Sequence, residues 1–256
     1  MPDTASDNVA TDGSVTTSES DGIEWAKYAK RYDDFIVPMT CYQDNINTLK
    51  DFLISNAKND ASTRICDLGA GTGIYIKAMS EVLPLASFTH VDRSADMSSY
   101  ASKRYASANL NINVIESAAE DLNFEAASMD IITAINVIYT LPEPKKRLED
   151  IYNWLKPGGY FFVIDFGRRQ NTADWTKYFL KELLVREGAI GTLKSIPSVL
   201  SLFRRQNEGA AAQDEGSYWI HSTSEFKSSL EAAGFSVDRA EPCYRGYSDL
   251  AICRKL

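Results

Sequence analysis

Three alternating glycines near residue 70 are the first feature of this sequence that could do chemistry. They lie in the segment Asp67-Leu-Gly-Ala-Gly-Thr-Gly73, between an apolar run at 64–68 and a helical pattern that begins at Ile74. Glycine permits a tight turn and lets the backbone approach a ligand closely, because no Cβ stands in the way. We therefore expect a ligand to bind against this turn.

Two carboxylates limit the kind of ligand. Asp67 ends the strand before the glycines, where it would repel the pyrophosphate of a dinucleotide. Asp92 ends the next expected strand, where a carboxylate can accept hydrogen bonds from both ribose hydroxyls. The dinucleotide pattern G-x-G-x-x-G also fails at Ile74. A nucleoside with a cationic end, such as S-adenosylmethionine, satisfies all of these features. The alternative for both carboxylates is a structural role, as a partner of the helix dipole or as a helix cap.

The elements that must position these residues alternate between strands and helices. Apolar runs predict strands, and apolar residues at helical spacing predict helices. Such alternation predicts parallel βαβ units, with helices on both faces of one sheet. Strands are expected over 64–68, 87–92, 112–116, 129–137, 160–165, 235–240 and 247–254. Helices are expected over 44–56, 74–83, 95–105, 145–155 and 223–233.

The end of the chain departs from this alternation. Ser222 and Glu225 form a capping-box pattern before the last expected helix, and Gly234 stands where a C-terminal cap belongs. No helix separates the last two strands, so these should be antiparallel. The sequence thus predicts an α/β fold, Rossmann-like and doubly wound, with a seven-stranded, mostly parallel sheet whose last strand is antiparallel.

Residues 169–216 interrupt the pattern with an expected helical insertion. Helical stretches are expected near 173–187 and 196–205, followed by a polar stretch near 207–216. The insertion follows the carboxyl end of a strand, where α/β sheets bind ligands. We interpret it as a lid over the active site; an ordinary packing pair of helices is the alternative.

Composition excludes several classes of protein. The 256 residues are 44% hydrophobic and 24% charged, which suffices for a full core. The net charge of −8 disfavours a dedicated nucleic-acid binder. Residues 1–22 carry five acidic and no basic residues, so we expect a disordered acidic tail before one domain at 23–256.

Location and metal content are also expected from the sequence. No apolar run is long enough for a membrane span, and no signal or transit peptide is evident. The four cysteines form no CxxC pair, which is typical of a reducing cytoplasm. No cluster has metal-ligand spacing, so we expect no metal. The oligomeric state is left open.

Four motifs occur in the order of a known family. They lie at 67–73, 91–97, 119–124 and 129–142, the last followed by Leu-Lys-Pro-Gly-Gly at 155–159. Over about residues 60–168 the chain resembles the class I S-adenosylmethionine-dependent methyltransferases. It is most similar to the small-molecule branch that includes the ubiquinone/menaquinone biosynthesis methyltransferases, with weaker similarity at 25–35 and 217–254.

The resemblance implies a role for each motif residue. Asp67 would contact the ammonium of the methionine moiety, and Asn136 would present its backbone near that moiety. Asp92 would hold the ribose. The backbone passing under the methionine moiety would be that of Gly69, Ala70, Gly71 and Gly73. The adenine would be bordered by Arg93, Met97, Ala119 and Glu120, and an N-terminal helix with Tyr28 would cover the cofactor. Many relatives have Asp where this chain has Ala118, which leaves the adenine contact of Glu120 less defined.

Methyl transfer from a sulfonium is an in-line displacement that mainly requires alignment and exclusion of water. A general base is needed only for an acceptor that must lose a proton. The candidates near the acceptor are Tyr139, Asp165 and His221. Packing, or for His221 a surface loop, is the alternative. The Asn-Val-Ile-Tyr sequence at 136–139 lacks the prolines of DNA amine methyltransferases, so we expect a small organic acceptor.

Other functions remain open on the sequence alone. One is a nicotinamide-dependent oxidoreductase, which Ile74 and Asp67 oppose. Another is a non-catalytic regulatory protein that binds S-adenosylmethionine, although its glycine turn should then be degraded. Whether oxygen, nitrogen or carbon receives the methyl group is not indicated by the sequence.

Overall fold

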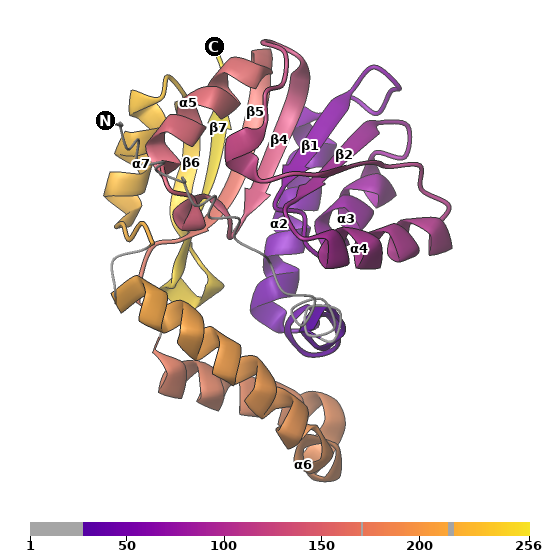
Figure 1. Ribbon diagram of the computed structural model, residues 1–256, viewed down its shortest axis with the longest axis vertical. Coiled ribbons are helices and arrows are strands. Elements are labelled where there is room, and N and C mark those ends of the chain that lie inside the picture. Colours follow the sequence, from indigo (N-terminus) through magenta and orange to yellow (C-terminus); the bar gives the residue numbers. More distant parts are fainter. Residues whose placement is uncertain (1–27, 170, 215–217) are drawn as a thin grey trace, which may run out of the picture.

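The computed structural model describes residues 28–169, 171–214 and 218–256, so the expected acidic tail at 1–22 lies outside the described residues. Its centre is a seven-stranded sheet in the order β3-β2-β1-β4-β5-β7-β6 (Figure 1). The strands β1 to β5 pair in parallel, and β7 pairs antiparallel with both β5 and β6. The expected fold class is confirmed. The strands are β1 (Arg64–Leu68), β2 (Ser87–Asp92), β3 (Asn113–Glu116), β4 (Met129–Ile135), β5 (Leu155–Phe166), β6 (Ser236–Cys243) and β7 (Ser248–Arg254).

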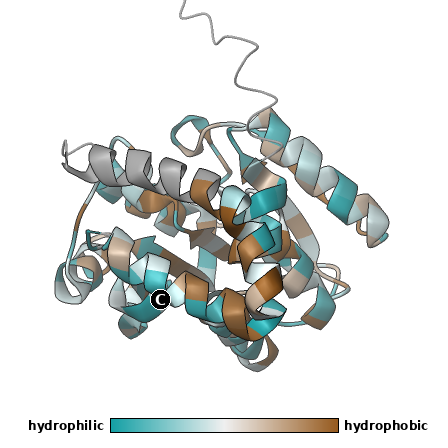
Figure 2. Cartoon of the chain, turned by 90° about the horizontal axis from the view of Figure 1, so that it is seen from below, coloured by the Kyte–Doolittle hydropathy of each residue, from teal (hydrophilic) through white to brown (hydrophobic). Residues whose placement is uncertain are grey.

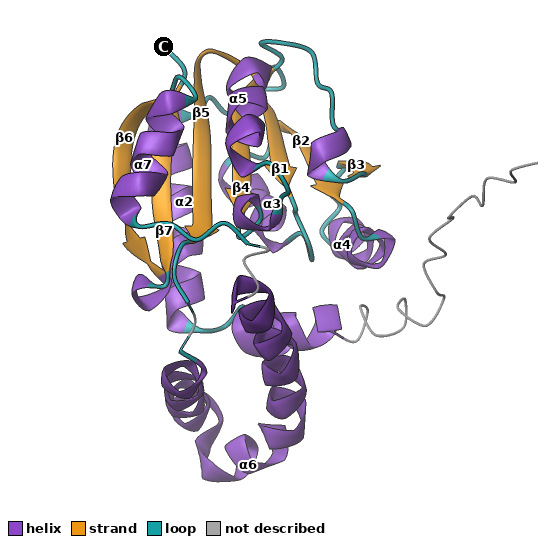
Figure 3. Ribbon diagram, turned by 60° about the vertical axis from the view of Figure 1, so that its left-hand side comes forward, coloured by secondary structure: helices purple, strands orange, loops and turns teal. Residues whose placement is uncertain are grey.

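Helices cover both faces of the sheet. The helices α5 and α7 pack on one face, and α2, α3 and α4 pack on the other (Figure 3). The longer helices are α2 (Thr40–Asn56), α3 (Ile74–Val82), α4 (Ala95–Ser107), α5 (Pro144–Trp154), α6 (Thr172–Asp214) and α7 (Thr223–Ala232). Short helical turns are η1 (Tyr32–Ile36), η2 (Ala119–Asp121), η3 (Ile138–Thr140) and η4 (Tyr244–Gly246).

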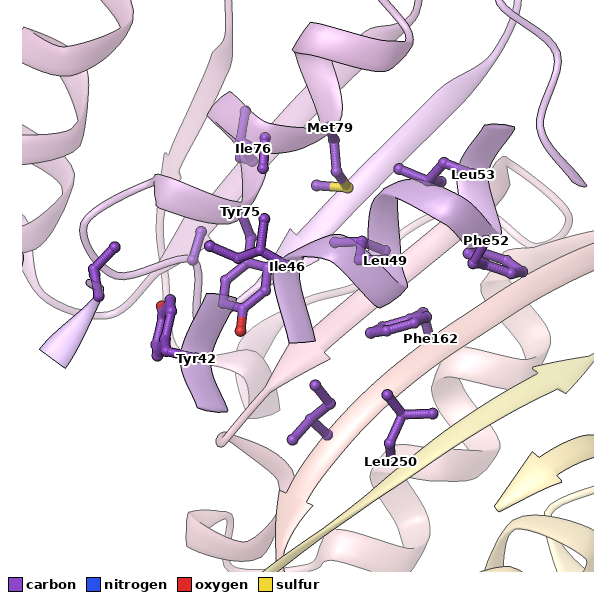
Figure 4. Packing of buried hydrophobic residues seen from close by; sticks show 14 of the residues in the cluster. Tyr42, Ile46, Leu49, Phe52, Leu53, Tyr75, Ile76, Met79, Phe162 and Leu250 are labelled. Atoms are coloured by element: carbon purple, nitrogen blue, oxygen red, sulfur yellow. The ribbon is translucent and has the colours of Figure 1, made fainter. Parts of the chain in front are cut away.

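Side chains of β5 supply both hydrophobic cores because successive residues of a strand point to opposite faces. Phe162 belongs to the core beneath α2 and α3, where it lies near Phe52 and the α2 side chains (Figure 4). Phe161 belongs to the core beneath α5 and α7. The continuous burial of residues 161–165 in β5 is what a strand covered on both faces requires.

Several element boundaries differ from expectation. β5 begins at Leu155 rather than at residue 160 and includes the Pro-Gly-Gly at 157–159, because Gly158 donates its N–H to the carbonyl of Lys255 (2.7 Å) and Gly159 accepts from the N–H of Lys255 (2.9 Å). β4 stops at Ile135, two residues early, because Asn136 turns the chain with φ 58°. α2 begins at Thr40 rather than residue 44.

The insertion is helical over nearly its whole length and extends from the body of the molecule (Figure 1). Gly188 breaks the helix axis of α6 with φ 69° and ψ 178°, and the expected polar stretch near 207–216 is helical up to Asp214. Phe179, Leu183 and Val199 pack into the core. Figure 2 views the molecule from below and colours hydrophobic residues brown. The exposed large hydrophobic residues of α6 include Leu184, Val185, Ile190, Leu193 and Leu200. Within the described ranges, no helix has the length and apolarity to cross a membrane.

Candidate active site

A cavity of about 350 Å³ lies at the carboxyl ends of β1 and β4. The glycine turn after β1 forms one side, and the N-terminal segment, α6 and η4 contribute to the other. This is the edge of a parallel sheet where ligands bind. Of the residues expected at the donor, those lining the cavity are Tyr28, Asp67, Gly69, Ala70, Gly71, Met97 and Asn136.

The three glycines of the turn all adopt left-handed backbone conformations. Their φ angles are 63° at Gly69, 54° at Gly71 and 74° at Gly73. A Cβ at Gly69 would come within 2.2 Å of Val137, and one at Gly73 within 2.3 Å of the Tyr105 hydroxyl. A Cβ at Gly71 would meet only the carbonyl of Gly69, at 3.9 Å, so this position is open toward the cavity.

Gly71→Ala is expected to weaken donor binding at least tenfold while lowering the free energy of unfolding by only about 1 kcal/mol, the strain of a left-handed alanine. The added methyl group meets no protein atom closely, so it occupies ligand space. Calorimetry with S-adenosylhomocysteine and urea denaturation measure the two effects. Gly69→Ala is the matched control; its clash with Val137 should cost about 2–4 kcal/mol of stability. Unchanged affinity in Gly71→Ala would contradict the placement of the donor against Gly71.

Asp67 is a nearly buried carboxylate at the end of β1. The Thr133 hydroxyl donates a hydrogen bond to its Oδ1 (2.6 Å). Burial raises the pKa of Asp67 to about 7, and the nearby Asp92 carboxylate adds to the increase, although the Thr133 hydrogen bond opposes it. A carboxylate in this position favours a cationic ligand group, because such a group compensates for the lost hydration.

Asp92 does not line the cavity but anchors the glycine turn. Its Oδ2 accepts the N–H of Gly71 (2.8 Å), and its Oδ1 accepts the N–H of Ser94 (2.8 Å), the N-cap of α4. Burial raises the pKa of Asp92, and the two backbone N–H groups partly oppose this. The structural alternative is thus observed at Asp92. The ribose role stays a prediction, with which these contacts are compatible because each oxygen retains a further lone pair.

The residues expected around the adenine are only partly brought together. Met97 is buried in the first turn of α4 and lines the cavity. Arg93 is exposed, and Ala119 is buried in η2 beside the exposed Glu120. Neither Arg93 nor the Ala119–Glu120 turn is among the cavity-lining residues. Their adenine contacts stay a prediction.

Asn136 bends the chain away from β4 and offers an unused acceptor. Its N–H donates to the carbonyl of Ile164 (2.7 Å), which holds the left-handed turn. Its side-chain Oδ1 is buried at the cavity and has no hydrogen-bond partner among the described residues. Together with Asp67, this oxygen suits an ammonium or amide donor on a ligand.

The N-terminal segment is fastened to the glycine turn by a charged clamp. Asp33 in η1 accepts the Thr72 hydroxyl (2.9 Å) and pairs with Arg104 of α4. Arg104 also donates to the carbonyl of Thr72 (2.8 Å). The clamp places Tyr28 and Tyr32 along the cavity.

Tyr139 is the catalytic candidate that lines the cavity. Its N–H donates to Asp165 Oδ1 (3.2 Å), which fixes its backbone after β4. Its ring packs at a near right angle against Tyr218, with centroids 5.1 Å apart and an interplanar angle of 82°. Burial raises the pKa of the Tyr139 hydroxyl, and Asp165 adds to this, so the hydroxyl stays neutral.

Asp165 and His221 do not line the cavity; they form a buried cluster behind Tyr139. His221 lies between two carboxylates, with Nε2 3.6 Å from Asp165 Oδ2 and Nδ1 3.4 Å from Asp249 Oδ2. Only 3% of His221 is exposed, so the surface-loop alternative is wrong. Burial lowers the pKa of His221, but the two carboxylates outweigh it and leave that pKa above its usual value.

Two sets of residues were missed by the sequence reasoning. Asp249 completes the cluster by accepting from Arg168 (2.9 and 3.0 Å) and from Thr223 (2.6 Å). No sequence signal connects these residues, because they lie 26 to 81 positions apart. The second set consists of further cavity tyrosines, which are Tyr32, Tyr42, Tyr75 and Tyr244.

Comparison with known families and sequences agrees with this geometry. Residues 66–163 match a family model described as a methyltransferase domain. The ubiquinone/menaquinone biosynthesis C-methyltransferase UbiE of Rhizobium rhizogenes is 32% identical over 147 residues, and the match spans 55% of each chain. The chain thus spans about half the length of this relative. The enzyme of the same name from Campylobacter jejuni is 26% identical over 75% of this chain and 79% of its own.

Solved structures share the fold at low identity. A SAM-dependent methyltransferase from Aquifex aeolicus superposes with a TM-score of 0.55 at 19% identity, covering 83% of this chain and 90% of its own. The CurJ carbon methyltransferase gives a TM-score of 0.62 at 15% identity, covering 89% of this chain and 57% of its own. These likenesses support the fold.

Proposed function

Because the chain carries a class I S-adenosylmethionine-dependent methyltransferase domain of the UbiE-like branch, as its motifs predict, we propose that it transfers a methyl group from S-adenosylmethionine to a small organic acceptor. The observation that carries this proposal is the cavity itself. A glycine turn with Asp67 and the unpaired Asn136 oxygen stands at one end, and an aromatic wall stands at the other. The cavity therefore has one end suited to the donor and another suited to a small acceptor.

The residues present fit this donor. Asp67 offers a carboxylate, and Asn136 Oδ1 an acceptor oxygen, to the ammonium group of the donor. Because Gly71 has no side chain, the donor has room to lie against the backbone of the glycine turn. Asp92, held by two N–H groups, has lone pairs left for the ribose hydroxyls. When bound, the donor supplies a methyl group already activated on a sulfonium.

The protein's part in the reaction is alignment and exclusion of water. Tyr139 and Tyr218 narrow the cavity at the carboxyl end of β4, where they would orient the acceptor. Tyr139 is the proposed catalytic contact, while Asp165 and His221 act as positioning residues through the Tyr139 backbone. Closure by the clamped N-terminal segment and α6 would keep water out.

Asp92→Ala is expected to weaken binding of S-adenosylhomocysteine at least tenfold, about 1.4 kcal/mol or more, because the ribose hydrogen bonds and the anchor of Gly71 are lost together. Titration calorimetry measures this. Asp96→Ala, in the first turn of the helix α4 that follows Asp92, is the matched control and should keep affinity within about threefold. Unchanged affinity in Asp92→Ala would remove Asp92 from the donor site.

Thermal melting separates this function from the alternatives. S-adenosylmethionine and S-adenosylhomocysteine should raise the melting temperature, whereas NAD should not. Stabilisation by NAD alone would instead favour an oxidoreductase. Stabilisation by S-adenosylmethionine with no labelled product from any small acceptor would favour a regulatory protein.

A further inference from the structure

The cavity wall that faces the glycine turn is aromatic and has no positive charge. Among the described lining residues there is no Lys, Arg or His, and the one carboxylate is Asp67. An acceptor with a carboxylate or phosphate would find no cation among these residues to balance its charge. The aromatic members of the wall include Tyr139, Phe166 and Tyr218.

The described lining also lacks a general base for the acceptor. Burial raises the pKa of Tyr139 and of Tyr244, so both hydroxyls stay protonated at neutral pH. Asp67 belongs to the donor end, and His221 is enclosed by two carboxylates behind the wall. An alcohol or a carbon acid must lose a proton before or during attack. An amine attacks through the free lone pair of its neutral form. Its ammonium form releases its proton to water before it binds, so no base in the cavity is needed.

Three rings form a corner near the end of β4. Tyr139 lies 5.1 Å from Tyr218 at an interplanar angle of 82°, and 5.7 Å from Phe166 at 54°. Because these rings are steeply inclined to one another, the faces of different rings can be directed toward the same bound group. Aromatic faces attract cations, including quaternary ammonium groups, through the quadrupole of the ring.

We propose that the acceptor is a small amine, methylated on nitrogen, and that Tyr139, Tyr218 and Phe166 hold the nitrogen as it becomes positive. This inference rests on the proposed function. The nitrogen lone pair forms the new N–C bond while the C–S bond of the donor breaks, and that electron pair stays on sulfur to give S-adenosylhomocysteine. The positive charge thus passes from sulfur to nitrogen. A primary or secondary amine then releases one proton to water, whereas a tertiary amine remains a quaternary ammonium product.

A charge-only comparison tests the inference. Choline and 3,3-dimethylbutan-1-ol have nearly the same shape, but only choline carries a positive charge. Calorimetry of both on the full chain saturated with S-adenosylhomocysteine, whose sulfur is neutral, should give choline at least tenfold tighter binding. Tyr139→Leu and Tyr218→Leu should each reduce this preference to below threefold, whereas Tyr139→Phe, which keeps the ring face, should preserve it.

The controls make the outcomes distinct. Tyr160→Leu, in the middle of β5 and outside the cavity lining, should leave the preference for choline unchanged. Equal or tighter binding of the neutral alcohol, or a preference that survives both leucine variants, would overturn the amine inference and leave the proposed methyl transfer standing. Failure of the wild-type chain to bind S-adenosylhomocysteine would instead overturn the proposed function.

Discussion

Replacing Asp249 by alanine is expected to lower the free energy of unfolding by about 3–5 kcal/mol. The fully buried Asp249 carboxylate accepts two hydrogen bonds from Arg168 and one from Thr223, and it lies 3.4 Å from His221. Alanine would leave the half-buried Arg168 guanidinium and the buried His221 imidazole without this partner, which costs more than the pair contributes. Urea denaturation followed by circular dichroism measures the loss.

A matched aspartate on the neighbouring strand supplies the control for Asp249. Asp238 on β6 approaches Arg254 at 4.0 Å, and both side chains are about two-fifths exposed. Exposed pairs of this kind contribute about 0–1 kcal/mol, so Asp238→Ala should have little effect. Equal losses of unfolding free energy in the two variants would contradict the expected cost of removing a partner from the buried cluster.

Donor affinity is expected to fall at least tenfold between pH 7.5 and pH 5.5. The pKa of Asp67 in the free protein is raised to about 7, so lowering the pH neutralises the carboxylate that would pair with the donor's ammonium. A bound cation favours the ionised carboxylate. Below pH 7 the donor must therefore displace a proton from Asp67 in order to bind, and its observed affinity falls. Calorimetry with S-adenosylhomocysteine across this range measures the change.

Two comparisons isolate Asp67 as the origin of the pH dependence. Asp67→Asn should bind S-adenosylhomocysteine at least tenfold more weakly at pH 7.5 and lose most of the pH dependence. 5′-Methylthioadenosine lacks the amino-acid moiety, so its affinity for the wild type should vary little. A pH profile retained in Asp67→Asn would assign the titration to another group.

The donor end of the site could be predicted because its signals are local in sequence. β1 and β2 have the expected bounds, since each is a short run with an aspartate as its last or second-last residue. The turn that follows β1 needs glycine at positions with left-handed backbone, and the three alternating glycines can be recognised in the sequence itself. The parallel sheet then followed from the alternation of runs and helices.

The acceptor end could not be predicted to the same depth because it depends on contacts between distant segments. Tyr42 and Tyr244 meet at the cavity only after α2 and η4 have docked, with ring centroids 6.0 Å apart. His221 was expected near the acceptor, but its burial between Asp165 and Asp249 arises from the pairing of β5 with β7. The spacing of residues along the sequence does not indicate which distant strands pair.

The sheet order divides the cavity between two parts of the chain. Residues 64–97 supply most of the donor end, whereas much of the aromatic wall comes from residues 28–42, α6 and 218–244. A laboratory selection for new acceptors should therefore accumulate its changes in these outer segments. The glycine turn would stay unchanged in such variants. Replacing the outer segments by those of a homologue is therefore a route to an altered substrate range.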